Sequence, residues 1–395
     1  MSHIMNTYAR LPVAFTHGQG VWLWDAQGKR YLDALGGIAV NTLGHAHPRL
    51  VKTISTQAGR LIHTSNLYQI TEQENLADKL AAISGMDKIF FCNSGCEANE
   101  AAIKIARLYA KGKGVENPAI VVMEKAFHGR TLATLSATGS RKVQAGFEPL
   151  VSGFVRVPYD DLEAVRQVAQ HNRNVVAVLV EPIQGEGGIN VAHLEYLRGL
   201  RELCDQYQWL LMLDEIQCGL GRTGKWFFYQ HAGLHPDVVT LAKGLAGGVP
   251  IGACLARGAA AEVFKQGNHG STFGGNTFVC AAALTTLEVI EQEQLLDNAA
   301  KVGDALRAGF TSALAGIKGV VAVRCMGLML GIELDRPCAE LIGRALAAGL
   351  LINFTADKVI RLLPPLILNQ DEARELVDTL SSLIRDFLSQ AAPAH

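Results

Sequence analysis

The chain has 395 residues, of which 49% are hydrophobic and 18% are charged, and its formal net charge is −1. This composition is typical of a globular protein with two or three domains and a large core, and it excludes a disordered chain. A net charge near zero gives no electrostatic support for binding nucleic acid or an anionic membrane. Apolar runs all stay well short of the roughly 18 residues of a membrane span, and the first residues lack a signal-peptide pattern, so we expect a cytoplasmic protein.

The N-terminal region begins with a predicted hairpin at residues 20–33, where two aromatic-rich runs flank the turn-like sequence Asp25-Ala-Gln-Gly28. A break at 44–48 precedes a predicted helix over about 49–61. Helical periodicity returns at 72–83.

From residue 88, strand and helix patterns alternate. We predict strands at 88–92, 119–123, 154–157, 175–180, 209–215 and 237–243, and helices at 97–110, 161–171 and 193–207. The strands are almost continuously apolar. Together with the alternation, this favours an α/β domain with a mostly parallel sheet covered on both faces.

The pattern changes after about residue 280. We predict helices at 278–292, 295–314, 337–348 and 371–390, with strands at 320–324, 328–333 and 350–353. This set is typical of an α+β unit. We therefore expect a large domain over 61–280 and a small domain built from both termini, 1–60 and 281–395.

Two of the predicted strands end in residues with ionisable side chains. The first ends at Asp214 and the second at Lys243. Open α/β sheets bind ligands at the edge where such strands end. Pyridoxal phosphate (PLP) needs this pair of groups, because an amine forms its Schiff base and a carboxylate keeps its pyridine nitrogen protonated.

Other strand ends carry weaker signals, each with a structural alternative. Ser94 and Glu97 have the spacing of a helix cap, and Gly95 would let backbone N–H groups approach a phosphate. Phe127 could stack on a planar ring, or it could be a core residue. The acids in the sequence 181–188 could face a ligand or only solvent.

Three further features of the sequence have a structural explanation. The sequence 219–224 matches G-x-G-x-x-G, but the aromatic segment after it does not predict the helix of a dinucleotide site, so we interpret it as a loop. His45 and His47 lack further metal ligands nearby, and we predict no metal site. The eight cysteines include no C-x-x-C pair and are expected to be reduced thiols.

Taken together, these motifs resemble the class III (ornithine-type) PLP aminotransferases of fold type I over nearly the full chain. The matching segments are 93–100, 127–130, 181–188, 213–217, 240–244 and 270–275. Within the family, residues 36–41 and 43–48 are most similar to acetylornithine-type members. The resemblance implies a homodimer with active sites at the interface.

The resemblance also implies roles for residues at the cofactor. Lys243 holds PLP and moves the proton, and Asp214 pairs with the pyridine nitrogen. The remaining implied cofactor contacts are Gln217 on the phenolic oxygen, Phe127 and Ile216 on the two ring faces, Gly95 and Cys96 at the phosphate, and Thr272 at the phosphate in the partner subunit.

For the substrates, the resemblance implies that Arg130, assisted by Ser271, binds the distal carboxylate of the amino donor. Glu186 and Arg361 form a switch, in which Arg361 pairs with Glu186 or with the carboxylate of 2-oxoglutarate. The implied reaction moves the δ-amino group of N2-acetyl-L-ornithine to 2-oxoglutarate. Alternative donors are succinyl-diaminopimelate, succinylornithine, ornithine and 4-aminobutyrate, and the alternative from another class is a nicotinamide-dependent dehydrogenase that uses the glycines at 219–224.

Overall fold

A seven-stranded sheet organises the middle of the chain in the computed structural model, which describes residues 3–390. Its strand order is β4-β12-β11-β10-β7-β5-β6. The strands are β4 (Lys88–Cys92), β5 (Ala119–Met123), β6 (Phe154–Val157), β7 (Val175–Val180), β10 (Leu210–Asp214), β11 (Val238–Leu241) and β12 (Gly252–Ala256). Only β12 runs antiparallel to its neighbours, so the predicted mostly parallel α/β sheet is confirmed.

Helices cover both faces of this sheet, as the near-continuous apolar strands require. Strand β7 is buried at every position. Helix α4 (Gly95–Gly112) packs on one face, while α3 (Thr71–Ser84), α7 (Leu162–His171) and α8 (Leu194–Tyr207) contribute to the core on the other. Because side chains alternate along a strand, Ile120 and Val122 join the α4 core while Val121 joins the opposite one.

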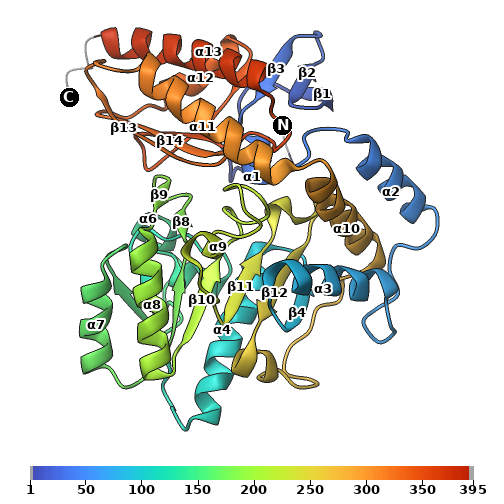
Figure 1. The fold of residues 1–395 in the computed structure, drawn as a ribbon, viewed down its shortest axis with the longest axis vertical. Coiled ribbons are helices and arrows are strands. Elements are labelled where there is room, and N and C mark those ends of the chain that lie inside the picture. Colours follow the sequence, from blue (N-terminus) through green and yellow to red (C-terminus); the bar gives the residue numbers. More distant parts are fainter. Residues whose placement is uncertain (1–2, 391–395) are drawn as a thin grey trace.

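A second unit combines the two ends of the chain and lies above the large sheet in Figure 1. One of its sheets has the order β13-β14-β17-β16, and the other has the order β1-β2-β3-β15. The strands are β1 (Phe15–Gln19), β2 (Trp22–Asp25), β3 (Arg30–Asp33), β13 (Val320–Met326), β14 (Met329–Leu334), β15 (Leu350–Leu351), β16 (Asn353–Thr355) and β17 (Val359–Leu362). Strand β15 pairs in parallel with β3, so N-terminal and C-terminal segments share one sheet.

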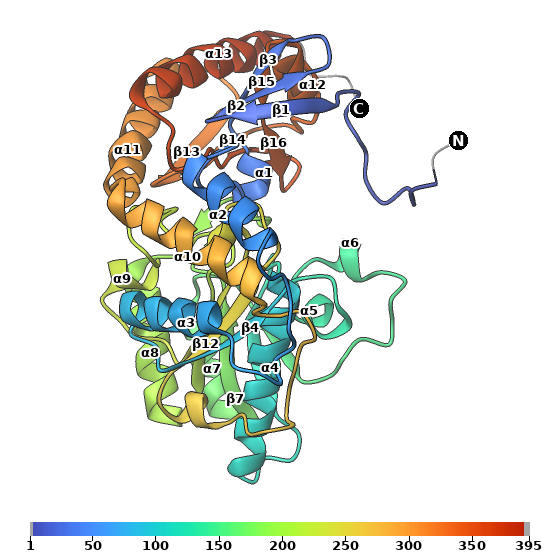
Figure 2. The same ribbon diagram turned by 90° about the vertical axis from the view of Figure 1, so that its right-hand side faces the viewer.

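Helices α11 (Leu295–Ala313), α12 (Glu340–Ala347) and α13 (Gln370–Ser389) cover this second unit. Between the two units, α2 (Pro48–Ala58) packs on α10 (Thr277–Gln292), as Figure 2 shows. The division at residues 60 and 280 stays a prediction. No helix within residues 3–390 has the length and apolar character needed to cross a membrane.

One strand prediction was wrong in detail, and some strands were missed. The single strand expected at 350–353 is two short strands, because the chain leaves β3 after Leu351 and pairs with β17 from Asn353 onward. Strands β12 and β17 were not predicted. The sequence of β12, Gly252-Ala-Cys-Leu-Ala256, has small residues in place of the β-branched and aromatic residues that mark strands.

Candidate active site

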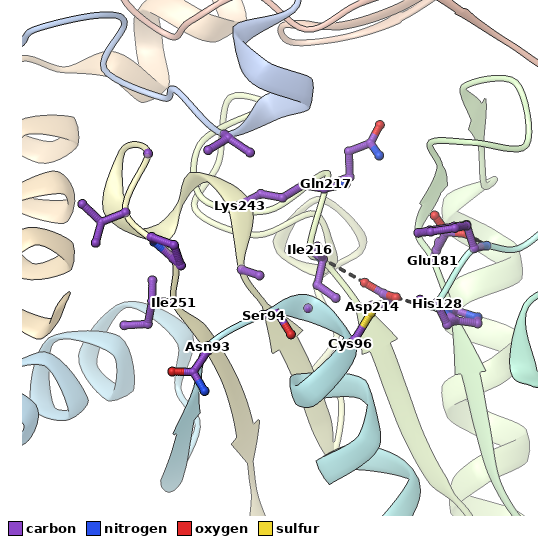
Figure 3. A pocket seen from close by; sticks show the side chains of 18 residues that line it. Asn93, Ser94, Cys96, His128, Glu181, Asp214, Ile216, Gln217, Lys243 and Ile251 are labelled. Atoms are coloured by element: carbon purple, nitrogen blue, oxygen red, sulfur yellow. Dashed lines mark hydrogen bonds and ion pairs between the residues drawn. The ribbon is translucent and has the colours of Figure 1, made fainter. Parts of the chain in front are cut away.

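A cavity of about 360 Å³ lies where β10 and β11 end, beneath the segment that leads from β3 to α2. Figure 3 shows side chains from several strand ends converging on it. Most of the predicted cofactor residues line it: Gly95, Cys96, Phe127, Asp214, Ile216, Gln217 and Lys243. Residues that are distant in sequence therefore form one site, as expected at the carboxyl edge of an α/β sheet.

Strand β11 ends at Leu241, two residues before the predicted end, and Lys243 begins a short 3₁₀ turn over Lys243–Ala246. Asp214 ends β10 beside Thr240 in the parallel ladder, which brings the lysine and the carboxylate to the same sheet edge. Burial lowers the pKa of Lys243, and the nearby charge of Arg361 lowers it further. Both effects favour the neutral amine, which is the nucleophilic form.

Asp214 is held by a buried hydrogen-bond network. Its Oδ2 accepts from His128 Nδ1 and from Asn99 Nδ2, each at 2.8 Å, and its Oδ1 accepts from the Ile216 N–H at 3.1 Å. Asn99 Oδ1 in turn accepts from Thr240 Oγ1 at 2.7 Å. This network fixes a carboxylate in a desolvated position, where it can stabilise a positive charge. His128 and Asn99 were not predicted as site residues.

The N-terminus of α4 offers backbone donors to the cavity. Ser94 caps the helix by accepting from the Glu97 N–H at 3.2 Å, but Glu97 returns to the N–H of Asn93 and not to that of Ser94. The predicted capping box is therefore shifted by one residue. A Cβ on Gly95 would lie 2.8 Å from Ile216 Cδ1, so glycine is required for this close approach. Backbone N–H groups in the first helical turn have no partner within the helix and bind anions well.

Cys96 lies in this same turn, and its Sγ accepts a hydrogen bond from the Arg130 N–H at 3.3 Å. The thiol is thus engaged with the loop that carries Phe127 and lines the cavity from that side.

Arg361 on β17 reaches the site from the second unit. It is 1% exposed, and its Nη1 donates to Glu186 Oε1 at 2.5 Å and to Gln217 Oε1 at 3.3 Å. Its Nε donates to Asn353 Oδ1 at 3.1 Å. The ion pair between Arg361 and Glu186 that the resemblance implies is present in this structure.

Glu181 is a further site residue that the sequence placed only in an acidic loop. It follows β7, lines the cavity, and accepts from the N–H groups of Phe127 at 2.8 Å and Gly185 at 3.3 Å. Burial raises its pKa to about 7, while nearby His128 acts in the opposite direction. This carboxyl group ties the loop of Phe127 to the loop that carries Glu186.

Five predicted site residues lie outside the cavity lining. Two of them, Glu186 and Arg361, form the ion pair described above. Arg130 is exposed, with its guanidinium carbon 5.6 Å from the ring centre of Phe127. Ser271 Oγ accepts from Asn93 Nδ2 at 3.3 Å, and Thr272 is exposed on the same loop. The structure therefore does not bring Thr272 to the cavity of its own chain, and its contribution to a partner's site stays a prediction.

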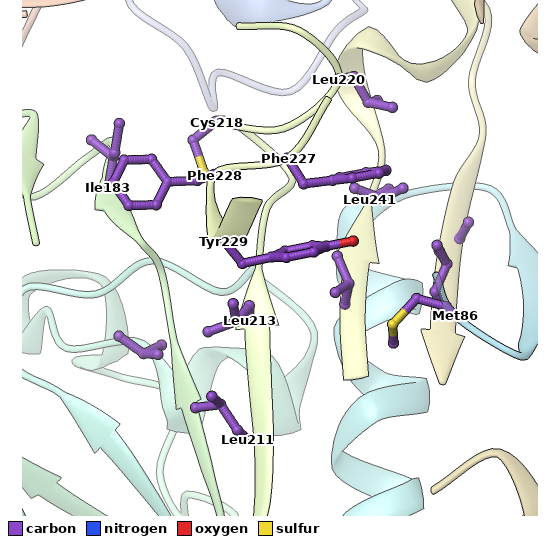
Figure 4. Close-up of a cluster of buried hydrophobic side chains, with 14 of the residues drawn as sticks. Met86, Ile183, Leu211, Leu213, Cys218, Leu220, Phe227, Phe228, Tyr229 and Leu241 are labelled. Atoms are coloured by element: carbon purple, nitrogen blue, oxygen red, sulfur yellow. The ribbon is translucent and has the colours of Figure 1, made fainter. Parts of the chain in front are cut away.

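The glycines at 219–224 form a loop and do not begin a long helix. The next helix, α9 (Tyr229–Ala232), has four residues. Figure 4 shows the aromatic side chains after the loop packed in the core. The rings of Phe227 and Tyr229 are stacked, with their centroids 5.3 Å apart. This geometry contradicts a dinucleotide site, so the dehydrogenase alternative was wrong.

The two histidines of the segment 44–48 each pair with one carboxylate. His45 bonds to Asp33 at 2.8 Å, and His47 to Glu293 at 3.2 Å. Across residues 3–390, no cluster of three or more histidine, cysteine, aspartate or glutamate side chains could hold a metal ion. All eight cysteines are free thiols.

The residues of the cavity fit PLP. Lys243 presents an amine, Asp214 a buried carboxylate, and the first turn of α4 a set of anion-binding N–H groups. Phe127 and Ile216 offer apolar surfaces within the same cavity. The absence of a side chain at Gly95 lets Ile216 pack closely against this turn.

Comparison with known proteins agrees with this geometry. Residues 4–384 match the family model described as aminotransferase class-III. The chain is 62% identical to the acetylornithine aminotransferase of Nitrosomonas europaea over 388 residues, which cover 98% of this chain and 99% of the relative.

Solved structures give the same result. The ornithine aminotransferase of Toxoplasma gondii ME49 superposes with a TM-score of 0.94 at 34% identity, covering 98% of this chain and 93% of that one. The acetylornithine aminotransferase of Elizabethkingia anophelis has a TM-score of 0.89 at 34% identity, covering 98% and 97%. The cavity, the family match and these relatives agree, and the chain belongs to the class III aminotransferases.

Proposed function

We propose that this chain transfers the δ-amino group of N2-acetyl-L-ornithine to 2-oxoglutarate, giving N-acetylglutamate semialdehyde and glutamate, a reaction of arginine biosynthesis. The observation that carries the proposal is that Lys243 and Asp214 line one cavity, and that the buried Arg361 contacts the lining residue Gln217. The choice of donor is supported by acetylornithine aminotransferases at 62% and 58% identity over almost the whole chain.

PLP is the cofactor of this reaction. When bound, it supplies a carbonyl group that condenses with amines and a pyridinium ring that accepts the electron pair of the broken C–H bond. Lys243 would hold the cofactor and carry the proton between the donor carbon and the cofactor carbon. Its lowered pKa suits a group that must accept that proton.

Asp214 would hold the pyridine nitrogen in its protonated form. His128 and Asn99 both donate to the same oxygen of Asp214, which fixes the direction of that carboxylate. Gln217 would bind the phenolic oxygen. Phe127 and Ile216 would enclose the ring, and the backbone N–H groups of Gly95 and Cys96 would bind the phosphate.

The two substrates place their carboxylates at different distances from the reacting carbon. The α-carboxylate of the amino donor is distant from its δ-carbon, whereas a carboxylate of 2-oxoglutarate is adjacent to the keto carbon. Arg361 paired with Glu186 presents no free cation, so an ω-amine can approach. Opening of the pair would free Arg361 to bind the carboxylate of the keto acid bidentately.

Arg130, assisted by Ser271, would bind the distal carboxylate of the donor. Arg130 is exposed within one chain and lies beside Phe127, at the side of the site that faces outward. We infer a homodimer in which Thr272 reaches the phosphate bound by the partner subunit. A cytoplasmic location and the absence of nucleic-acid or membrane partners are part of the same proposal.

The test is the visible spectrum of the purified protein with PLP, followed by addition of N-acetylornithine without a keto acid. A shift from the absorbance of lysine-bound PLP to that of the aminated cofactor supports both the half-reaction and the donor. If the spectrum does not change, the donor is wrong, and succinyl-diaminopimelate, succinylornithine, ornithine and 4-aminobutyrate are tested next. A protein that takes up no PLP refutes the proposal.

A further inference from the structure

Lys243 adopts a backbone conformation that non-glycine residues rarely occupy. Its φ is 42°, in the left-handed region, and the preceding Ala242 has φ −165° and ψ −138°. Such a conformation persists only where surrounding contacts determine it. The turn that begins at Lys243 must therefore be held by contacts from outside it.

Thr42 makes such a contact from a distant part of the chain. Its Oγ1 donates to the carbonyl oxygen of Gly244 at 3.0 Å, although the two residues are 202 positions apart. Thr42 is 2% exposed. The approach is close, because a Cβ on residue 244 would lie only 2.4 Å from Thr42 Oγ1. A larger residue at 244 would displace the threonine.

Thr42 is also fixed by the C-terminal part of the chain. Its carbonyl oxygen accepts from the Leu366 N–H at 2.9 Å. Leu366 follows β17, the strand that carries Arg361. Thr42 therefore links the segment after the strand of Arg361 to Gly244, the residue next to Lys243.

The segment before Thr42 has an unusual conformation. Four consecutive residues, 36–39, have φ values of 55°, 64°, 66° and 61°. One of them is Ile38, whose β-branched side chain strongly disfavours this region. The turn is held at its start by Asp33 Oδ1, which accepts from the N–H groups of Leu35 at 3.0 Å and Gly36 at 2.8 Å. This left-handed turn is followed directly by Val40, which lines the cavity, and two residues later by Thr42.

We propose that Thr42 is a positioning residue. By binding the carbonyl oxygen of Gly244 it holds the turn that begins at Lys243, and with it the Lys243 amine, in the orientation that amino transfer requires. Thr42 does not line the cavity, so it acts through Gly244 and touches neither substrate nor cofactor. This inference rests on the proposed function, because the orientation of the Lys243 amine affects catalysis only if the chain transfers amino groups.

The test compares Thr42→Val, which keeps the shape and removes the hydroxyl, with Thr42→Ser, which keeps the hydroxyl. In the PLP-loaded enzyme we expect Thr42→Val to lower kcat about tenfold while KM changes by less than about twofold, because one buried hydrogen bond and the alignment of one group are lost. We expect Thr42→Ser to restore most of kcat. The second readout is the pH midpoint of the visible absorbance of lysine-bound PLP, which should shift in Thr42→Val and not in Thr42→Ser.

Ser84→Ala is the matched control. Ser84 is also buried, and its Oγ donates to the Leu80 carbonyl oxygen at 2.6 Å, but it lies at the end of α3 outside the cavity lining. It should lower the thermal midpoint without changing kcat or the absorbance midpoint. If Thr42→Val yields no folded protein, Thr42→Ala takes its place in the same comparison.

An unchanged kcat and absorbance midpoint in the hydroxyl-free variant would overturn the inference. A loss that Thr42→Ser fails to rescue, or that Ser84→Ala reproduces, would assign the effect to packing and overturn it as well. If the unaltered enzyme transfers no amino group, the proposed function fails, and the absorbance midpoint alone then decides whether Thr42 orients Lys243.

Discussion

Removal of the carboxylate of Glu186 tests how one cavity accepts two substrates. The Arg361 guanidinium is 1% exposed, and Glu186 is its charged partner at 2.5 Å; Asn353 and Gln217 offer only neutral oxygens. Breaking a buried ion pair costs about 3–5 kcal/mol. Because the Glu186 side chain is 38% exposed, solvent screening reduces the coupling to about 1.4–2.8 kcal/mol.

That free energy opposes any substrate that must take Arg361 away from Glu186. Glu186→Ala removes this free-energy cost. The rate constant with glutamate as amino donor, relative to that with N-acetylornithine, should therefore rise about 10- to 100-fold. The assay is the single-turnover rate constant of each half-reaction, followed by the absorbance of the bound cofactor.

The control is Glu291→Ala, which removes a surface ion pair with Lys79 at 2.7 Å and should leave the ratio of the two donors unchanged. An unchanged or reduced preference for glutamate in Glu186→Ala would refute the switch. A lower rate with both donors and the same ratio would also refute it, because such a result describes general damage to the site.

Three further predictions concern single residues. Lys243→Ala should abolish steady-state turnover, because the group that holds the cofactor and carries the proton is missing; a full-rate variant would remove the central claim. His128→Phe deprives Asp214 of a donor at 2.8 Å and should lower kcat about tenfold with little change in KM; equal kcat values would show that His128 does not support Asp214. Burial raises the pKa of Glu215 from 4.5 to about 8, so between these pH values the folded state binds more protons than the unfolded state. Stability should therefore fall as pH rises through this window, by up to about 1.4 kcal/mol per pH unit, and denaturant unfolding of Glu215→Gln should show a flatter dependence.

The strands of the large sheet were predictable because each is buried on both faces. A strand such as β7, Val175–Val180, has an apolar residue at every position, and this pattern is hard to mistake. The places where such strands end then follow, and with them the neighbouring positions of Asp214 and Lys243. The same reasoning fails for β12, where small residues carry no strand signal and the structure gains the strand through pairing with β4 and β11.

Residues that act through other residues were the hardest to predict. Glu181 and Glu186 stand five positions apart in one acidic loop; the family resemblance implies a role for Glu186 only, and the residue pattern by itself gives no role for Glu181. The structure separates the two. Glu181 directly follows β7 and is buried, and its carboxylate accepts hydrogen bonds from two backbone N–H groups. Glu186 is more exposed, and its carboxylate accepts from Arg361.

Thr42 and His128 show the same limit over longer distances. The only local signal near Thr42 is the pair of glycines at 36 and 37, which indicates an unusual turn but not its hand or its target. Its partner Gly244 is 202 positions away, and Thr42 is also held by Leu366, which follows β17 near the other end of the chain. A lysine at a strand end can therefore be identified from sequence, whereas the contact that orients it depends on how the two ends of the chain meet.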